Sequence, residues 1–145
     1  MQKFNYKIEI NASKQKVWAI LLEDKTYREW VSVFCEGSYA VSDWNEGSKV
    51  LFLGTNESGM FSVIQKKIPN EFISFKHLGM MKEGKEQPMD EETKHWSGAT
   101  ENYALSENNG MTTLSLEMDM SENDLPFFAE AFEKGFAIIK KLAEN

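Results

Sequence analysis

The sequence predicts an α+β fold in which a curved antiparallel sheet wraps a long C-terminal helix and leaves an apolar pocket between them. Three observations predict it. The chain opens with an alternating apolar and polar segment, continues through six strand-like segments separated by short turns, and closes with a long amphipathic segment. Short connections favour antiparallel neighbours, and a helix with one apolar face needs another layer to cover that face.

Length and composition set the frame for this prediction. A chain of 145 residues is typical of one domain, so we expect a single domain over residues 1–145. The composition, with 41% hydrophobic and 27% charged residues, is that of a globular protein. The net charge of −7 opposes binding to a nucleic-acid backbone or an anionic membrane surface. We therefore expect neither nucleic acid nor membrane as a partner.

Cysteine content and the start of the chain bear on location. Cys35 is the only cysteine, which leaves no partner for an intrachain disulfide and no multi-cysteine zinc site. The first residues pass directly into an alternating pattern with no signal-peptide segment, and no apolar run approaches the ~20 residues of a spanning helix. The sequence therefore predicts a cytoplasmic protein.

The first elements are a strand and a helical elbow. Apolar residues alternate with polar ones over residues 4–10, which predicts a strand with one buried face. Ser13 is placed to cap a short helix that runs to Leu22. Asp24 is placed to cap a second short helix, in which Tyr27 and Trp30 share one side.

Strand-like segments then follow one another with turn residues between them. They are expected over residues 33–43, 49–53, 60–68, 72–78, 97–105 and 112–120. Asn, Gly and Pro clusters separate most of them, and the last segment alternates most cleanly. With the first strand, these segments predict a curved antiparallel sheet of about seven strands.

Two further segments complete the pattern. Residues 80–95 are polar, contain Gly84 and Pro88 and lack a period, which predicts a long loop that either covers a binding site or is simply mobile. The final helix is expected to be capped by Ser121 or Asn123, and its apolar residues recur every three to four positions. Gly135 in its middle indicates a close approach to a strand or another helix.

Several short fragments, in this order and spacing, resemble the SRPBCC (START-like) superfamily, and within it the branch named for the activator of Hsp90 ATPase homologue domain. The resemblance spans nearly the whole chain. Besides the long C-terminal helix, it is carried by Ile10, Ala12, Val17 and Trp18, by Trp30, by Trp44 with Gly47 and Ser48, by the turn at Pro69, by Trp96, and by Glu101 with Tyr103 and Leu105.

This resemblance implies a helix-grip fold with a deep cavity between the sheet and the C-terminal helix. Across the superfamily such cavities hold lipids, polyketides, hormones and other hydrophobic molecules. Members include carriers, receptors and cyclases, so the fold alone does not select one activity.

Candidate lining residues follow from strand parity and from the apolar stripe of the final helix. The apolar candidates are Phe52, Phe75, Trp96, Tyr103, Leu116, Met118, Phe128 and Phe132. Aromatic and methionine side chains that cluster at one interface are typical of apolar ligand sites, although each of them alone could be plain core.

Three polar residues are candidates for fixing a ligand. His77 shares the inward parity of Phe75, and Glu101 lies two residues before Tyr103, so these side chains could orient a ligand or transfer protons. Glu91 and His95 would share a helical face, but no second histidine is near and no metal is expected. No serine-nucleophile elbow occurs, no catalytic residue is assigned and no cofactor is expected.

These observations predict the binding of a small hydrophobic molecule, by a carrier or sensor. Two alternatives stay open at this point: a cyclase- or hydrolase-type enzyme that uses the same pocket, and a chaperone-associated interaction domain. A homodimer is compatible with the sequence, which leaves the identity of the ligand open.

Overall fold

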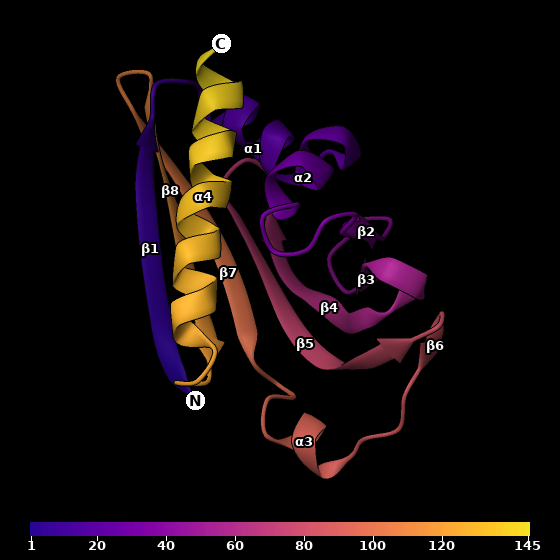
Figure 1. Cartoon of the computed structure of the whole chain (residues 1–145). Coiled ribbons are helices and arrows are strands. Elements are labelled where there is room, and N and C mark those ends of the chain that lie inside the picture. Colours follow the sequence, from indigo (N-terminus) through magenta and orange to yellow (C-terminus); the bar gives the residue numbers. More distant parts are fainter.

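The computed structural model describes residues 1–145, and it has the α+β architecture that the sequence predicts. A curved sheet of eight strands, all paired antiparallel, is wrapped around the long helix α4 (Figure 1). The strands follow the order β1-β8-β7-β5-β4-β3-β2, and the short β6 pairs with β5. The elements are β1 (Gln2–Ile10), α1 (Lys14–Leu22), α2 (Asp24–Val31), β2 (Tyr39–Val41), β3 (Lys49–Leu53), η1 (Thr55–Glu57), β4 (Gly59–Ile68), β5 (Phe72–Lys82), β6 (Lys85–Glu86), α3 (Glu91–Lys94), β7 (Thr100–Asn108), β8 (Met111–Met120) and α4 (Leu125–Glu144).

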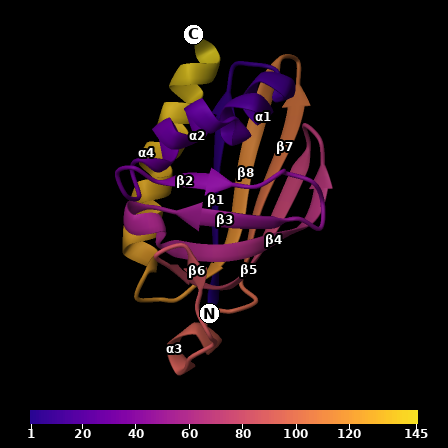
Figure 2. The same cartoon turned by 90° about the vertical axis from the view of Figure 1, so that its right-hand side faces the viewer.

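Helix α4 covers one part of the sheet only. It lies along β1, β8 and β7, whereas β5, β4 and β3 curve away from it (Figure 1). In the view turned by 90°, β2 to β4 run across the direction of β1 and β8 (Figure 2). The sheet therefore bends strongly between its two edges, and α1 and α2 cover one end of the concave side.

The contact between α4 and the sheet confirms the predicted core. In the register of β1 with β8, Tyr6 lies opposite Leu116. The ring of Tyr6 lies 5.5 Å from that of Phe136, a residue of α4 that is fully buried. This is the packing expected when a strand with one apolar face meets the apolar stripe of a helix.

The helical elbow is confirmed, with one correction. The Ser13 side chain accepts a hydrogen bond from the backbone N–H of Lys16 and caps α1 as predicted. Asp24 does not cap α2. Glu23, in extended conformation, both ends α1 and precedes α2, so Asp24 falls inside the first turn and pairs with Arg28. A single-residue connection leaves no room for the predicted cap.

The strand predicted over residues 33–43 is wrong in its first half. Only Tyr39–Val41 is a strand, and the preceding residues form turns in which Gly37 has a φ of 85°. Phe34 packs its ring 4.7 Å from that of Phe132 on α4. The half-buried Phe34 therefore packs against a helix, which period-two reasoning does not anticipate.

The long loop predicted over residues 80–95 is also largely wrong. Strand β5 continues to Lys82 and turns through Glu83 and Gly84, both with positive φ, into β6. Asp90 then caps the short helix α3 by accepting a hydrogen bond from the backbone N–H of Thr93. Only a few residues between β6 and α3 lack regular structure, because local turn and cap chemistry organises the rest.

The start of α4 differs from the prediction as well. Neither Ser121 nor Asn123 caps this helix. Asp124 occupies the cap position without a side-chain cap bond, and its carboxylate instead accepts a hydrogen bond from the Ser121 hydroxyl at 2.8 Å. Pro126 in the first turn suits a helix start, since its missing N–H would have no partner there.

Gly135 marks the predicted close approach, and its neighbour is α2. A Cβ atom added at Gly135 would lie 3.1 Å from Cε3 and 3.2 Å from the carbonyl oxygen of Trp30.

We expect Gly135→Val to lower the free energy of unfolding by about 1–3 kcal/mol, because the added atoms have no space. Denaturant unfolding measures this loss. Glu133→Val, on an exposed position of the same helix, is the control, and equal losses for the two variants would contradict the steric explanation.

Candidate functional site

A large cavity opens on the concave side of the sheet, where the strands curve away from α4. Its volume is about 840 Å³, and 20 of its 32 lining residues are hydrophobic. The lining residues come from all four α-helices and from six strands, so the cavity depends on the whole fold. Cavities of this size and character are typical of sites for small organic ligands.

The structure brings together nine of the ten residues that the sequence singles out as a ligand site. The nine lining residues are Phe52, Phe75, His77, Trp96, Glu101, Tyr103, Met118, Phe128 and Phe132. Leu116 does not line the cavity, although its inward parity is correct. It lies opposite Tyr6, at the level where α4 rests on the sheet, and is buried in the core. Met118, two residues further along β8, reaches the cavity instead.

Sequence reasoning missed a group of aromatic residues from the helical elbow. Tyr27 and Trp30 of α2, together with Phe34, line the cavity. Trp30 lies at the centre of this group, with its ring 5.5 Å from Tyr27 and 6.3 Å from Phe34. The shared helical face of Tyr27 and Trp30 was the available signal, because such a face must pack on something apolar.

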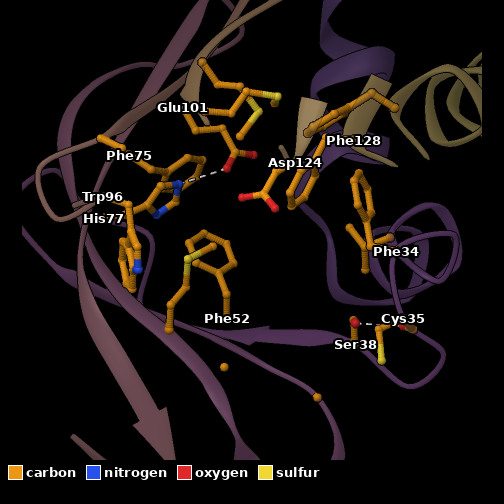
Figure 3. Close-up of a pocket in the computed structure, with 18 of the residues that line it drawn as sticks. Phe34, Cys35, Ser38, Phe52, Phe75, His77, Trp96, Glu101, Asp124 and Phe128 are labelled. Carbon is orange, nitrogen blue, oxygen red and sulfur yellow. Dashed lines mark hydrogen bonds and ion pairs between the residues drawn. The ribbon is translucent and has the colours of Figure 1, made fainter. Parts of the chain in front are cut away.

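A chain of hydrogen bonds lies at the border of the cavity and joins β4, β5 and β7. Nδ1 of His77 lies 2.6 Å from the Ser62 hydroxyl oxygen, and Nε2 lies 3.0 Å from a carboxylate oxygen of Glu101. The Tyr103 hydroxyl donates to the other oxygen of Glu101. Figure 3 shows the contact between His77 and Glu101 with Phe75 beside it.

Strand register explains this convergence. Ser62 lies opposite His77 in the pairing of β4 with β5, directly after an irregularity in the register at Phe61. Glu101 lies opposite Phe75 in the pairing of β5 with β7, and so lies next to His77 along the strand direction. An irregularity in strand register changes the direction in which side chains point. Here it accompanies the contact between the Ser62 hydroxyl and Nδ1 of His77.

The hydrogen bonds assign the protonation of His77. The Ser62 side chain is fully buried, and Nδ1 of His77 is its single hydrogen-bond partner. A buried hydroxyl hydrogen needs an acceptor, so Ser62 donates to Nδ1, which then carries no hydrogen. Nε2 therefore bears the imidazole hydrogen and donates it to Glu101. His77 is neutral in this arrangement.

The two tyrosines near Glu101 retain their protons. Burial, followed by the negative charge of Glu101, raises the pKa of Tyr103 well above its ordinary value. The same two causes, in the same order, raise the pKa of Tyr27. Each phenol can therefore donate a hydrogen bond in the cavity but does not act as a base at neutral pH.

Ser62, His77 and Glu101 are the residue types of a nucleophilic triad, but their arrangement is unsuited to that chemistry. A triad needs its serine hydroxyl exposed to substrate, with the histidine between serine and carboxylate. Here Ser62 is fully buried and does not line the cavity, whereas Glu101 does. The cavity is therefore lined by the histidine and the carboxylate, and not by the serine that would have to act as nucleophile.

The rim of the cavity carries further polar residues. Glu92 and His95, in and just after α3, line it together with Trp96. No group of three or more His, Cys, Asp or Glu side chains lies close enough together to hold a metal ion. None of the helices is long and apolar enough to cross a membrane.

Comparison with solved structures places this arrangement among known folds. The chain is similar to the Aha1 dimer from Colwellia psychrerythraea, with a TM-score of 0.75 and 18% identity over 99% of this chain and 97% of that one. ChR145 from Cytophaga hutchinsonii gives a TM-score of 0.70 and 19% identity over 100% and 95%. CalU16 from Micromonospora echinospora gives 0.67 and 17% over 99% and 76%.

These likenesses confirm the predicted helix-grip fold, which this chain shares with the Aha1 and ChR145 structures. No protein-family model matches the sequence, and no curated protein matches it. At identities below one fifth, the shared property is the backbone arrangement with its sheet and gripped helix.

Proposed function

We propose that this protein binds one small, largely hydrophobic molecule in the cavity between the sheet and α4, as a carrier or sensor. The observation that carries the proposal is the cavity itself, with a volume of about 840 Å³ and a mainly apolar lining. Apolar walls with a few convergent polar groups are the usual composition of such sites. The resemblance to the SRPBCC superfamily, which implies a cavity for hydrophobic molecules at this place, supports the same function.

The lining divides into two roles in this proposal. Aromatic side chains such as Phe52 and Phe128 supply affinity by removing apolar ligand surface from water, worth roughly 25 cal/mol per Å². Glu101, held by His77 and Tyr103, supplies orientation, since its carboxylate has lone pairs left for a donor on the ligand. We call Glu101 with these two hydrogen-bond donors the anchor; its three residues are fixed by two paired strands, β5 and β7.

A neutral fluorescent probe tests the proposal. N-phenyl-1-naphthylamine is expected to bind at one site per chain, with enhanced emission. Phe128→Ala should weaken its binding by at least about fivefold, or about 1 kcal/mol, because Phe128 lines the cavity.

Phe127 provides the matched control. It is the residue before Phe128 on the same helix, is 53% exposed and does not line the cavity, so Phe127→Ala should leave probe affinity unchanged. Probe binding that is absent, or that responds equally to both substitutions, would defeat the proposed function.

The two alternatives from the sequence remain predictions without a specific observation in their favour. A cyclase- or hydrolase-type enzyme would have to work without Ser62, which is buried away from the cavity. A chaperone-associated domain would need a contiguous apolar surface, whereas the exposed large apolar residues come from different elements, such as Val41 of β2, Met111 of β8 and Phe127 of α4. The similar structure from Colwellia psychrerythraea is described as a dimer, so a homodimer of this chain remains a prediction.

A further inference from the structure

We propose that the hydrophobic molecule bound in this cavity carries a positively charged nitrogen, as in a lipophilic amine or a quaternary ammonium compound. The inference rests on the proposed function, since it names the chemical class of the ligand for the same cavity. It is argued from the charges, the hydrogen bonds and the aromatic side chains of the lining.

The first step concerns the charge of the anchor. Glu101 has a side chain only 14% exposed, and it accepts hydrogen bonds from His77 and Tyr103. Both donors are neutral, because Ser62 donates to Nδ1 of His77 and the phenol keeps its hydrogen. Neutral donors stabilise a carboxylate but do not cancel its charge. The cavity wall therefore carries a largely buried negative charge.

The second step concerns the missing counter-charge. None of the 32 lining residues is Lys or Arg, whereas four are carboxylates, namely Glu92, Glu101, Asp119 and Asp124. Asp119 is paired with Lys3 at 2.8 Å, whereas Glu101 has no Lys or Arg partner and contacts only the neutral imidazole of His77. Met1, which carries the terminal amino group, also lines the cavity but is 62% exposed, so its charge is hydrated and not buried beside Glu101. A buried charge without a counter-ion is costly, so a cationic ligand group would offset that cost.

Figure 3 shows how two of these carboxylates are placed. Glu101 and Asp124 both point into the space between the Phe75–His77 side and the Phe34–Phe128 side of the cavity. Asp124 adds a second negative group at the start of α4, where it is exposed to solvent. A ligand cation between the two would face negative charge from β7 and from α4.

The third step concerns the aromatic rings, which suit the same kind of group. Ten of the lining residues are aromatic: Tyr27, Trp30, Phe34, Tyr39, Phe52, Phe75, Trp96, Tyr103, Phe128 and Phe132. The faces of aromatic rings attract cations, and quaternary ammonium groups are recognised by cages of such rings. The same lining disfavours a carboxylate or phosphate group, which would meet the charge of Glu101 and no Lys or Arg side chain.

Three ligands with one alkyl chain and different head groups test the inference. Dodecyltrimethylammonium, dodecanol and dodecanoate, each below the concentration at which it forms micelles, compete with N-phenyl-1-naphthylamine for the unaltered protein. Dodecyltrimethylammonium is expected to bind at least about tenfold more tightly than dodecanoate, with dodecanol between them.

Glu101→Gln then separates the anchor from the general attraction of an acidic protein for cations. It removes the charge but keeps the side-chain shape, and should reduce the advantage of the ammonium ligand at least about fivefold. Glu117→Gln removes an exposed charge from β8 and should leave the advantage unchanged. If Glu101→Gln impairs folding, Asp124→Asn, at an exposed position, is measured in the same way, and should also reduce the advantage.

Each outcome has one meaning. Dodecanoate binding as tightly as the ammonium ligand, or an ammonium preference that Glu117→Gln reduces as much as Glu101→Gln, would overturn the inference and leave the hydrophobic cavity intact. Failure of the neutral probe and of all three alkyl ligands to bind would instead defeat the proposed function.

Discussion

Phe136→Ala is expected to lower the free energy of unfolding by about 3–5 kcal/mol, the cost of removing a fully buried aromatic ring from a packed core. Phe136 is fully buried in the middle of α4. Its ring lies 5.5 Å from Tyr6, 6.2 Å from Trp30 and 6.4 Å from Tyr103. It thus joins the helix to β1, α2 and β7 at once. Urea unfolding followed by tryptophan fluorescence measures the loss.

The control for this prediction is Phe127→Ala, nine residues earlier on the same helix. Phe127 is 53% exposed, so its removal should change the free energy of unfolding by no more than about 0.5 kcal/mol. If Phe136→Ala unfolded at the same urea concentration as Phe127→Ala, the packing of α4 on the sheet described here would be wrong.

Met118→Trp is expected to weaken binding of N-phenyl-1-naphthylamine by more than about tenfold, which corresponds to about 1.4 kcal/mol. Met118 lines the cavity and lies opposite Glu101 in the pairing of β7 with β8. An indole at this position would occupy space that the probe needs. Fluorescence titration at fixed protein concentration gives the affinity.

The thermal midpoint is measured alongside, because a larger side chain in a buried position also strains the fold. Met111→Trp, at the exposed start of the same strand, introduces the same side chain away from the cavity and should leave the affinity unchanged. If a folded Met118→Trp protein bound the probe with unaltered affinity, the probe would not bind in the cavity beside Met118.

The sequence predicts the regular part of the fold well, because its signals there are local. Strands β1 and β8 alternate residue by residue, and the apolar stripe of α4 recurs with helical spacing. These patterns persist in the structure because one face of each element is buried and the other meets solvent. The same parity rule places Phe75, His77 and Tyr103 correctly on the concave face.

Prediction fails where burial comes from a distant partner. Phe34 lies in turns and not in a strand, because its ring packs on Phe132, almost a hundred residues later. Ser62 gave no sequence signal, since its role depends on a register irregularity between β4 and β5. Leu116 points to the concave face as its position in the strand predicts, but it packs in the core, whereas Met118 on the same face lines the cavity. Which of the two happens depends on where α4 stops covering the sheet, and the strand pattern does not contain that information.

The binding of a hydrophobic molecule inside the cavity is tested most directly by NMR contacts between bound N-phenyl-1-naphthylamine and methionine methyl groups. Four of the eight methionines line the cavity, namely Met1, Met60, Met118 and Met120. Nuclear Overhauser effects are expected from the probe to Met118 and Met120, which are buried, and not to Met89 or Met111, which are exposed and do not line the cavity. Contacts to Met89 or Met111 with none to Met118 and Met120 would contradict the account.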